Sequence, residues 1–118
     1  MDITAAIPQG QPQIDAYGDG GFRISGQHYQ QDLLVQASGV TPWDGAFRVG
    51  LLDASVEILL FGFGRSPRRL PQDFAAELKV RGIGYDSMDS GAACRTYNVL
   101  AAEGRRIAAL LCLSLIHI

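Results

Sequence analysis

The second half of the sequence alternates short apolar segments with segments of helical pattern. Residues 56–61 (VEILLF) form a near-continuous apolar run, which is typical of a strand covered on both faces. Residues 83–88 (IGYDSM) and 106–113 (RIAALLCL) have the pattern of two further strands. A helix between two such strands brings the chain back so that both strands run in the same direction. The alternation therefore predicts a parallel β-α-β-α-β unit.

Both predicted helices have recognisable ends. In residues 70–82 (LPQDFAAELKVRG), Pro71 lies near the first helical position, where no amide donor is needed, and Gly82 follows the last turn. Asp89 or Ser90 can cap the second helix, because either side chain can accept a hydrogen bond from a free amide. Gly104 is placed to end that helix before the last strand.

The first third of the chain has the rhythm of an antiparallel β meander. Strands are expected over residues 13–17, 21–25 and 32–37. Asp19 and Gly20 can take the positive φ angles that a tight hairpin turn requires. Residues 38–47 are expected to form a loop, because Pro42 disfavours a central strand, and Trp43 is expected to anchor this loop on the core.

Composition excludes several classes of protein. The chain has 118 residues, of which 47% are hydrophobic, so it can bury the core of one folded domain. The net charge of -2 argues against a nucleic-acid partner, since phosphate binding usually requires an excess of Lys and Arg. Residues 107–118 are too short an apolar stretch to cross a membrane, and no secretory signal is recognisable. We expect a flexible tail over residues 1–12, a single domain over residues 13–118 and a cytoplasmic location.

The cysteines and histidines do not form a recognisable metal or disulfide pattern. Cys94 and Cys112 are far apart and fit neither a zinc motif nor a secreted framework, so we expect two free thiols. His28 and His117 are isolated, with no carboxylate at ligand spacing. No metal or other cofactor is therefore expected.

The loops that follow the first two parallel strands should leave the same edge of the sheet. They comprise residues 62–69 (GFGRSPRR) and residues 89–91 (DSG). In open α/β sheets, a crevice at this edge is the usual place for a ligand. The candidate binding residues at this edge are Gly62, Gly64, Arg65, Arg68, Arg69, Ser90, Gly91, Cys94 and Arg95.

The chemistry of this edge is open to two interpretations. The arginines and the free amides of the second helix could hold an anion, although GFGRS lacks the full dinucleotide or phosphate-loop pattern. Alternatively, the glycines permit tight bends and the arginines are solvated. The start of a helix lowers the pKa of a thiol such as Cys94, yet no catalytic base accompanies it, which favours a structural buried thiol. We therefore predict no catalytic residues.

Four stretches of the chain resemble the Mth domain family. They are YGDGGFRISGQHY, TPW, VEILLFGFG and RGIGYDSMDSGAACRTYNVLAAEGRRIAA. The family consists of small proteins of unknown biochemical activity, and it includes bacterial members and a mitochondrial factor for the assembly of respiratory complex I. The resemblance implies a three-layer α/β domain with a mixed central sheet and a smaller β layer. The chain departs from the family pattern in its short stretch between Trp43 and Val56, where a turn is expected around residues 51–54, and in residues 113–118.

The resemblance gives the first functional hypothesis, a non-enzymatic interaction domain that is similar to a respiratory-complex assembly factor and binds a protein partner. The alternative is a protein that binds a small anion or a nucleotide-like ligand, with or without catalysis, in the crevice at the strand ends. A third use of the site, redox chemistry at Cys94, would require a lowered thiol pKa.

Overall fold

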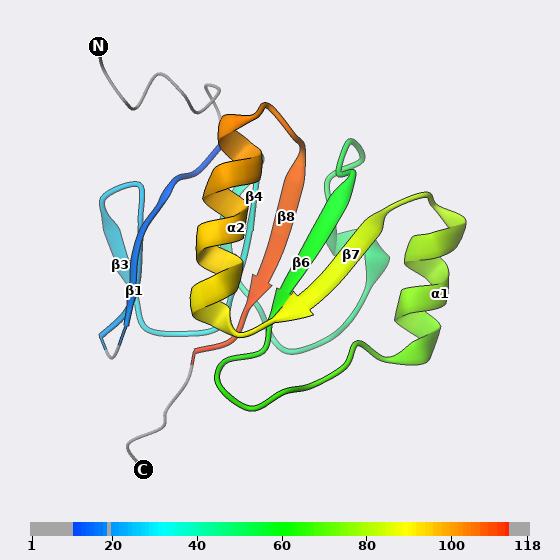
Figure 1. Ribbon diagram of the computed structural model, residues 1–118, viewed down its shortest axis with the longest axis horizontal. Helices are drawn as coiled ribbons and strands as arrows, with labels where there is room; N and C mark the ends of the chain where they lie inside the picture. Colours follow the sequence, from blue (N-terminus) through cyan, green and yellow to red (C-terminus); the bar gives the residue numbers. More distant parts are fainter. Residues whose placement is uncertain (1–10, 19, 114–118) are drawn as a thin grey trace.

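A mixed sheet of five strands forms the centre of the computed structural model, which describes residues 11–18 and 20–113 (Figure 1). The elements of the N-terminal half are β1 (Ile14–Gly18), β2 (Gly21–Ile24), β3 (Gln27–Tyr29), β4 (Leu33–Gln36), β5 (Gly39–Pro42) and the short 3-10 helix η2 (Val49–Leu51). The elements of the C-terminal half are β6 (Ile58–Gly62), α1 (Gln72–Val80), β7 (Gly84–Met88), α2 (Ser90–Ala102) and β8 (Ile107–Leu111). The result is the α/β domain that the sequence pattern predicts.

The central sheet has the strand order β5-β4-β8-β6-β7. β6 runs parallel to both β7 and β8, whereas β4 is antiparallel to β5 and β8. All five residues of β8 and four of the five in β6 are buried, as the near-continuous apolar runs lead one to expect. The predicted parallel β-α-β-α-β unit is confirmed.

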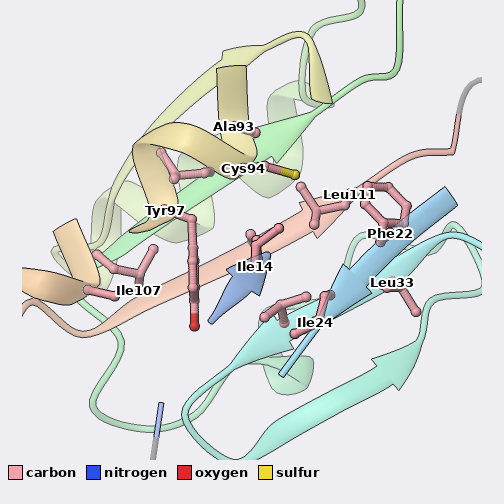
Figure 2. Close-up of a cluster of buried hydrophobic side chains, with 13 residues drawn as sticks. Ile14, Phe22, Ile24, Leu33, Ala93, Cys94, Tyr97, Ile107 and Leu111 are labelled. Atoms are coloured by element: carbon pink, nitrogen blue, oxygen red, sulfur yellow. The ribbon is translucent and has the colours of Figure 1, made fainter. Parts of the chain in front are cut away.

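Two apolar clusters cover the two faces of this sheet. On one face, α2 and the small antiparallel sheet β1-β2-β3 bury residues that include Phe22 and Tyr97 (Figures 1 and 2). On the other face, α1, η2 and their loops bury residues that include Trp43 and Phe74. These layers confirm the three-layer domain with a mixed sheet and a smaller β layer.

The helices begin and end as predicted. The Asp89 carboxylate caps α2, because its Oδ1 accepts a hydrogen bond of 2.8 Å from the Ala92 amide. Gly82 and Gly104 have φ angles of +73° and +81° just after α1 and α2, the left-handed conformation that glycine adopts most easily. Pro71 is the residue immediately before α1 rather than its first residue.

The first third forms the predicted antiparallel β meander, but the strands of this meander differ from those expected. β3 was not expected, and the strand predicted over residues 32–37 is β4, which leaves the meander to join the central sheet. Residues 38–47 contain β5 instead of only a loop. Pro42 is compatible with β5 because this strand lies at the edge of the sheet and the proline is its last residue. Trp43 is buried as predicted, and its indole Nε1 donates to the Ala46 carbonyl at 2.7 Å.

Several predictions fall at or beyond the limits of the described residues. Asp19, His117 and residues 1–10 of the predicted tail lie outside them. The division into a tail over residues 1–12 and a domain over residues 13–118 therefore stays a prediction. Within residues 11–18 and 20–113, the longest helix is shorter than a membrane crossing requires, and neither helix is apolar enough for one.

Candidate functional site at the strand ends

The ends of β6 and β7 lie side by side, as the predicted parallel pairing requires. Gly62, the last residue of β6, is in register with Met88, the last residue of β7. Beyond this pair, the Phe63 amide donates to the Met88 carbonyl at 3.0 Å, and the Ser90 amide donates to the Gly64 carbonyl at 3.0 Å. The two loops therefore start from one edge of the sheet (Figure 1).

Ser90 joins three segments of chain at this edge. Its side chain is fully buried, and its hydroxyl accepts a hydrogen bond of 2.8 Å from the Gly64 amide. The same hydroxyl donates to the Cys112 carbonyl at 2.7 Å. These two bonds connect the first residue of α2 to the loop after β6 and to the chain after β8. The hydroxyl thus acts as a structural link inside the protein.

Gly62 allows α2 to approach the sheet closely. A Cβ atom on this residue would lie 3.0 Å from Ala93 Cβ, from Leu111 Cδ2 and from Ser90 Cα. These distances leave no space for a side chain. Gly64 is constrained differently, since its φ angle of +84° lies in the left-handed region. Both glycines therefore have a backbone reason for their position.

The start of α2 already holds a carboxylate. Asp89 Oδ1 accepts the Ala92 amide, so the partial positive charge of the helix start is offset by a residue of the chain itself. Arg95 lies one turn further, and its Nη1 approaches to 3.4 Å the point that a Cβ on Gly91 would occupy. Any anion bound here would have to share these donors with Asp89.

Cys94 is a buried thiol. Only 5% of the residue is exposed, and Figure 2 shows its sulfur among the side chains of the cluster on the α2 face. Burial raises the pKa of the thiol to about 12, which outweighs the lowering by the nearby charge of Arg95. The predicted lowering by the helix start therefore does not prevail, and Cys94 is protonated at neutral pH. This geometry agrees with the structural interpretation of the residue.

A cavity of about 210 Å³ lies between α2 and β1 and brings together Gly91, Cys94 and Arg95. Its lining also includes Asp15, Tyr17 and Asn98. The Asn98 side chain forms two hydrogen bonds with the backbone of β1, as a paired strand would. Its Oδ1 accepts from the Ile14 amide at 3.0 Å, and its Nδ2 donates to the Ile14 carbonyl at 2.6 Å. No local sequence signal points to the β1 residues of this cavity, since they are distant from α2 along the chain.

Arg68 lies on the opposite face of the central sheet. Its guanidinium carbon is 5.3 Å from the ring centre of Phe61 and 5.9 Å from that of Phe47. Both distances are within the range of a cation–π interaction. Its Nη1 also lies 3.9 Å from Cys112 Sγ. Burial raises the pKa of the Cys112 thiol, although Arg68 opposes the shift. Arg68 therefore covers the second apolar cluster.

The other two arginines of this loop have different surroundings. Arg65 and Arg69 are both exposed, and Arg69 also borders a cavity between α1 and β7. The nine candidate residues consequently share one edge of the sheet but not one pocket. The reason is topological, because β6 leads to α1 on one face and β7 leads to α2 on the other.

The described residues give no cluster of three or more His, Cys, Asp and Glu side chains that could hold a metal ion. Cys94 and Cys112 are both free thiols, and they belong to the apolar clusters on opposite faces of the central sheet.

Known proteins with similar sequences extend this description. An uncharacterised protein of Rhodobacter capsulatus is 40% identical over 83% of this chain and 82% of its own length. The NADH dehydrogenase (ubiquinone) 1 alpha subcomplex assembly factor 3 of Danio rerio is 31% identical over 83% of this chain. The matched region is 62% of that assembly factor, so the two proteins differ in length.

Solved structures share the fold. A Bartonella henselae protein described as an outer membrane protein superposes with a TM-score of 0.76 at 35% identity, covering 92% of this chain and 98% of that protein. A Bordetella pertussis protein described as a Mth938-like domain gives a TM-score of 0.70 at 27% identity, covering 99% of this chain and 94% of that protein. This likeness confirms the resemblance found in the sequence. A family described as protein of unknown function DUF498/DUF598 matches residues 14–112. The chain therefore belongs to the DUF498/DUF598 family.

Proposed function

We propose that this protein is a non-enzymatic interaction domain that binds a protein partner during the assembly of a respiratory complex. The proposal depends mainly on one observation, namely that polar groups at the strand ends form hydrogen bonds within the chain. The Ser90 hydroxyl, the Gly64 amide and the Asp89 carboxylate all bond within the chain. The edge therefore has few polar groups left for chemistry on a small substrate.

The groups that face solvent at this edge are mainly arginines. Arg65, on the loop after β6, and Arg95, in the helix α2 that follows β7, are both exposed. A guanidinium has a planar set of donors that suits carboxylates of a partner protein. The assembly factor of Danio rerio, which aligns with most of this chain, supports an NADH dehydrogenase subunit or assembly intermediate as the partner.

Quantitative affinity capture from native cells tests this proposal. Arg65→Glu and Arg95→Glu should each lower the recovery of NADH dehydrogenase subunits relative to the unaltered protein. Arg23→Glu is the matched control, because Arg23 is an exposed arginine in the small sheet. Equal recovery with all three variants, or no recovery of such subunits with any protein, would refute the proposal.

A small anion or nucleotide-like ligand is the second candidate. The cavity between α2 and β1 supports it, since this cavity brings Arg95 together with Gly91 and Cys94. A ligand that binds only the folded state should raise the melting temperature as its concentration rises. Phosphate, nucleotides and small carboxylates are the probes, and Arg95→Gln should remove any such rise. An unchanged melting temperature with every probe would rule against this candidate.

The cellular location also stays a prediction. We expect the protein in the cytoplasmic fraction, and its recovery with a membrane fraction after a high-salt wash would contradict that expectation.

A further inference from the structure

We infer that a groove between α1 and the open edge of β7 binds an extended acidic segment of a partner protein, which adds a strand to the central sheet. The inference deepens the proposed function, on which it rests for the existence of a protein partner. We call this surface the β7 groove and define it by Arg69, Gln72, Lys79, Tyr85 and Ser87.

Within the part of the chain that the structure describes, one edge of β7 has no neighbouring strand. β7 is the last strand of the order β5-β4-β8-β6-β7. The Gly84 amide donates to the Glu57 carbonyl, and the Met88 carbonyl accepts from the Phe63 amide. In a parallel pair, alternate residues point their backbone groups to the same neighbour. Gly84, Asp86 and Met88 therefore bond toward β6, and the backbone groups of Tyr85 and Ser87 point outward.

The outward groups are not fully used within the chain. The Ser87 amide donates to the neighbouring Asp86 carboxylate at 2.9 Å. Among the described residues, neither the Tyr85 amide nor the Tyr85 and Ser87 carbonyls have a hydrogen-bond partner outside the β6–β7 ladder. An added strand could bond to all three groups, which is how sheet edges recognise extended peptides.

Two cavities follow this edge and meet at Tyr85. One has a volume of about 290 Å³ and lies between Lys79, near the end of α1, and the start of β7. The other has a volume of about 260 Å³ and lies between Gln72, at the start of α1, and Ser87. A strand laid along β7 would present alternate side chains toward them, since every second side chain of a strand points to the same face.

The charge of the groove indicates an acidic occupant. Arg69 borders one cavity and Lys79 borders the other, and none of the described residues that line them carries a carboxylate. Asp86 is in register with Leu60, which belongs to the cluster on the α2 face, so its side chain leaves the strand on that face, and its carboxylate reaches back to the Ser87 amide at the strand edge. A second copy of this chain is a poor occupant, because a symmetric pair would place the same cations against one another.

The spacing of the two cations sets the pattern of the segment. Arg69 precedes α1 and Lys79 lies in its last turn, so they are separated by about 10 Å or more along the helix axis. Residues four apart in a strand lie on one face at a distance of about 13 Å. The segment should therefore carry acidic side chains at positions i and i+4.

Titration with designed peptides, followed by amide NMR shifts, tests the inference. The probe is acetyl-Thr-Glu-Val-Thr-Val-Glu-Val-Thr-amide, and its control has Lys in place of both Glu. The Glu peptide should bind at least about tenfold more tightly than the Lys peptide, with shifts at Tyr85 and Ser87. The double variant Arg69→Glu, Lys79→Glu should reverse this preference. Tyr85→Pro should abolish binding of the Glu peptide, because it removes an outward donor without breaking a bond to β6.

Three results would overturn the inference. The first is equal affinity for both peptides. The second is amide NMR shifts confined to residues 62–65 and 89–95. The third is that the chain forms a dimer, which the Tyr85→Pro substitution dissociates. The last result would assign the groove to a second copy. The titration needs no native partner, so it can fail while capture through Arg65 and Arg95 succeeds, and the reverse is also possible. Failure of the groove is therefore distinguishable from failure of the proposed function.

Discussion

Some side chains at the strand ends are buried and stabilise the fold through hydrogen bonds within the chain. Ser90 is the clearest case, because one buried hydroxyl satisfies an amide from one loop and a carbonyl from another. A serine that begins a helix after an aspartate has the sequence pattern of a cap. The capping bond comes from Asp89, and the position of Ser90 under the loop depends on contacts that are distant in the chain.

Replacing Ser90 by alanine should destabilise the protein. The Gly64 amide and the Cys112 carbonyl would lose a buried partner, which typically costs about 1–3 kcal/mol. Urea unfolding measures the change in free energy. Ser66→Ala, in an exposed position of the same loop, is the control and should change the stability by less than about 0.5 kcal/mol. Equal effects of the two variants would contradict the linking role of Ser90.

Cys94 should react very slowly with iodoacetamide in the folded protein. Only the thiolate reacts, and a pKa of about 12 leaves little thiolate at pH 8. Because the thiol loses its proton only at high pH, the alkylation rate should keep rising with pH above the usual pKa range of cysteine. Alkylation of a Cys112→Ser variant isolates this thiol, and the same variant unfolded in urea serves as the control. A rate that levels off near pH 8 would instead indicate an activated thiolate and revive the redox hypothesis.

At the scale of the elements, the close contact between α2 and β6 sets the shape of the edge. Gly62→Ala should cost about 1–3 kcal/mol, since its methyl group would overlap three atoms of α2 and β8. Gly84→Ala is a matched control in β7, where the nearest neighbour of a new Cβ is the Glu57 carbonyl oxygen at 3.7 Å. Thermal unfolding compares the two. A similar melting temperature for both variants would show that α2 can move away from β6.

The small sheet should be held to the rest of the molecule by α2. Asn98→Ala removes both hydrogen bonds to the Ile14 backbone, so β1 and its neighbours should open more often. Trypsin then should cut faster after Arg23, in the middle strand of the small sheet. Thr96→Ala is a control on the same helix, because the Thr96 hydroxyl contacts Met88 instead of β1. If both variants were cut at the rate of the unaltered protein, the small sheet would be stable without Asn98.

Some helices and strands can be predicted from the sequence and others cannot, for physical reasons. α1, α2 and the parallel strands were found because caps and apolar runs are local signals. The sequence does not predict β5, because the strand begins with a glycine and ends with a proline. Both residues indicate a loop unless the strand is known to lie at the edge of a sheet. The path of β4 could not be predicted, since it depends on pairing Leu33 with Leu111, far along the chain.

At the scale of the whole molecule, the topology separates residues that the sequence grouped together. Consecutive loops leave one edge, but α1 and α2 cover opposite faces of the sheet. Arg68 therefore contacts the apolar cluster on one face, and Cys94 belongs to the cluster on the other. The edge itself was predictable from the strand and helix pattern. The division of its side chains was not, because it depends on which face each helix covers.

Amide hydrogen exchange of Gly64, followed by NMR, tests the central claim most directly. That claim is that the strand-end edge is locked by hydrogen bonds within the chain and offers its arginines to a partner. The Gly64 amide should exchange as slowly as the amides of β6, and Ser90→Ala should remove this protection while leaving that of β6 largely intact. Rapid exchange of Gly64 in the unaltered protein would contradict the claim, because the loop would then be free to rearrange around a ligand.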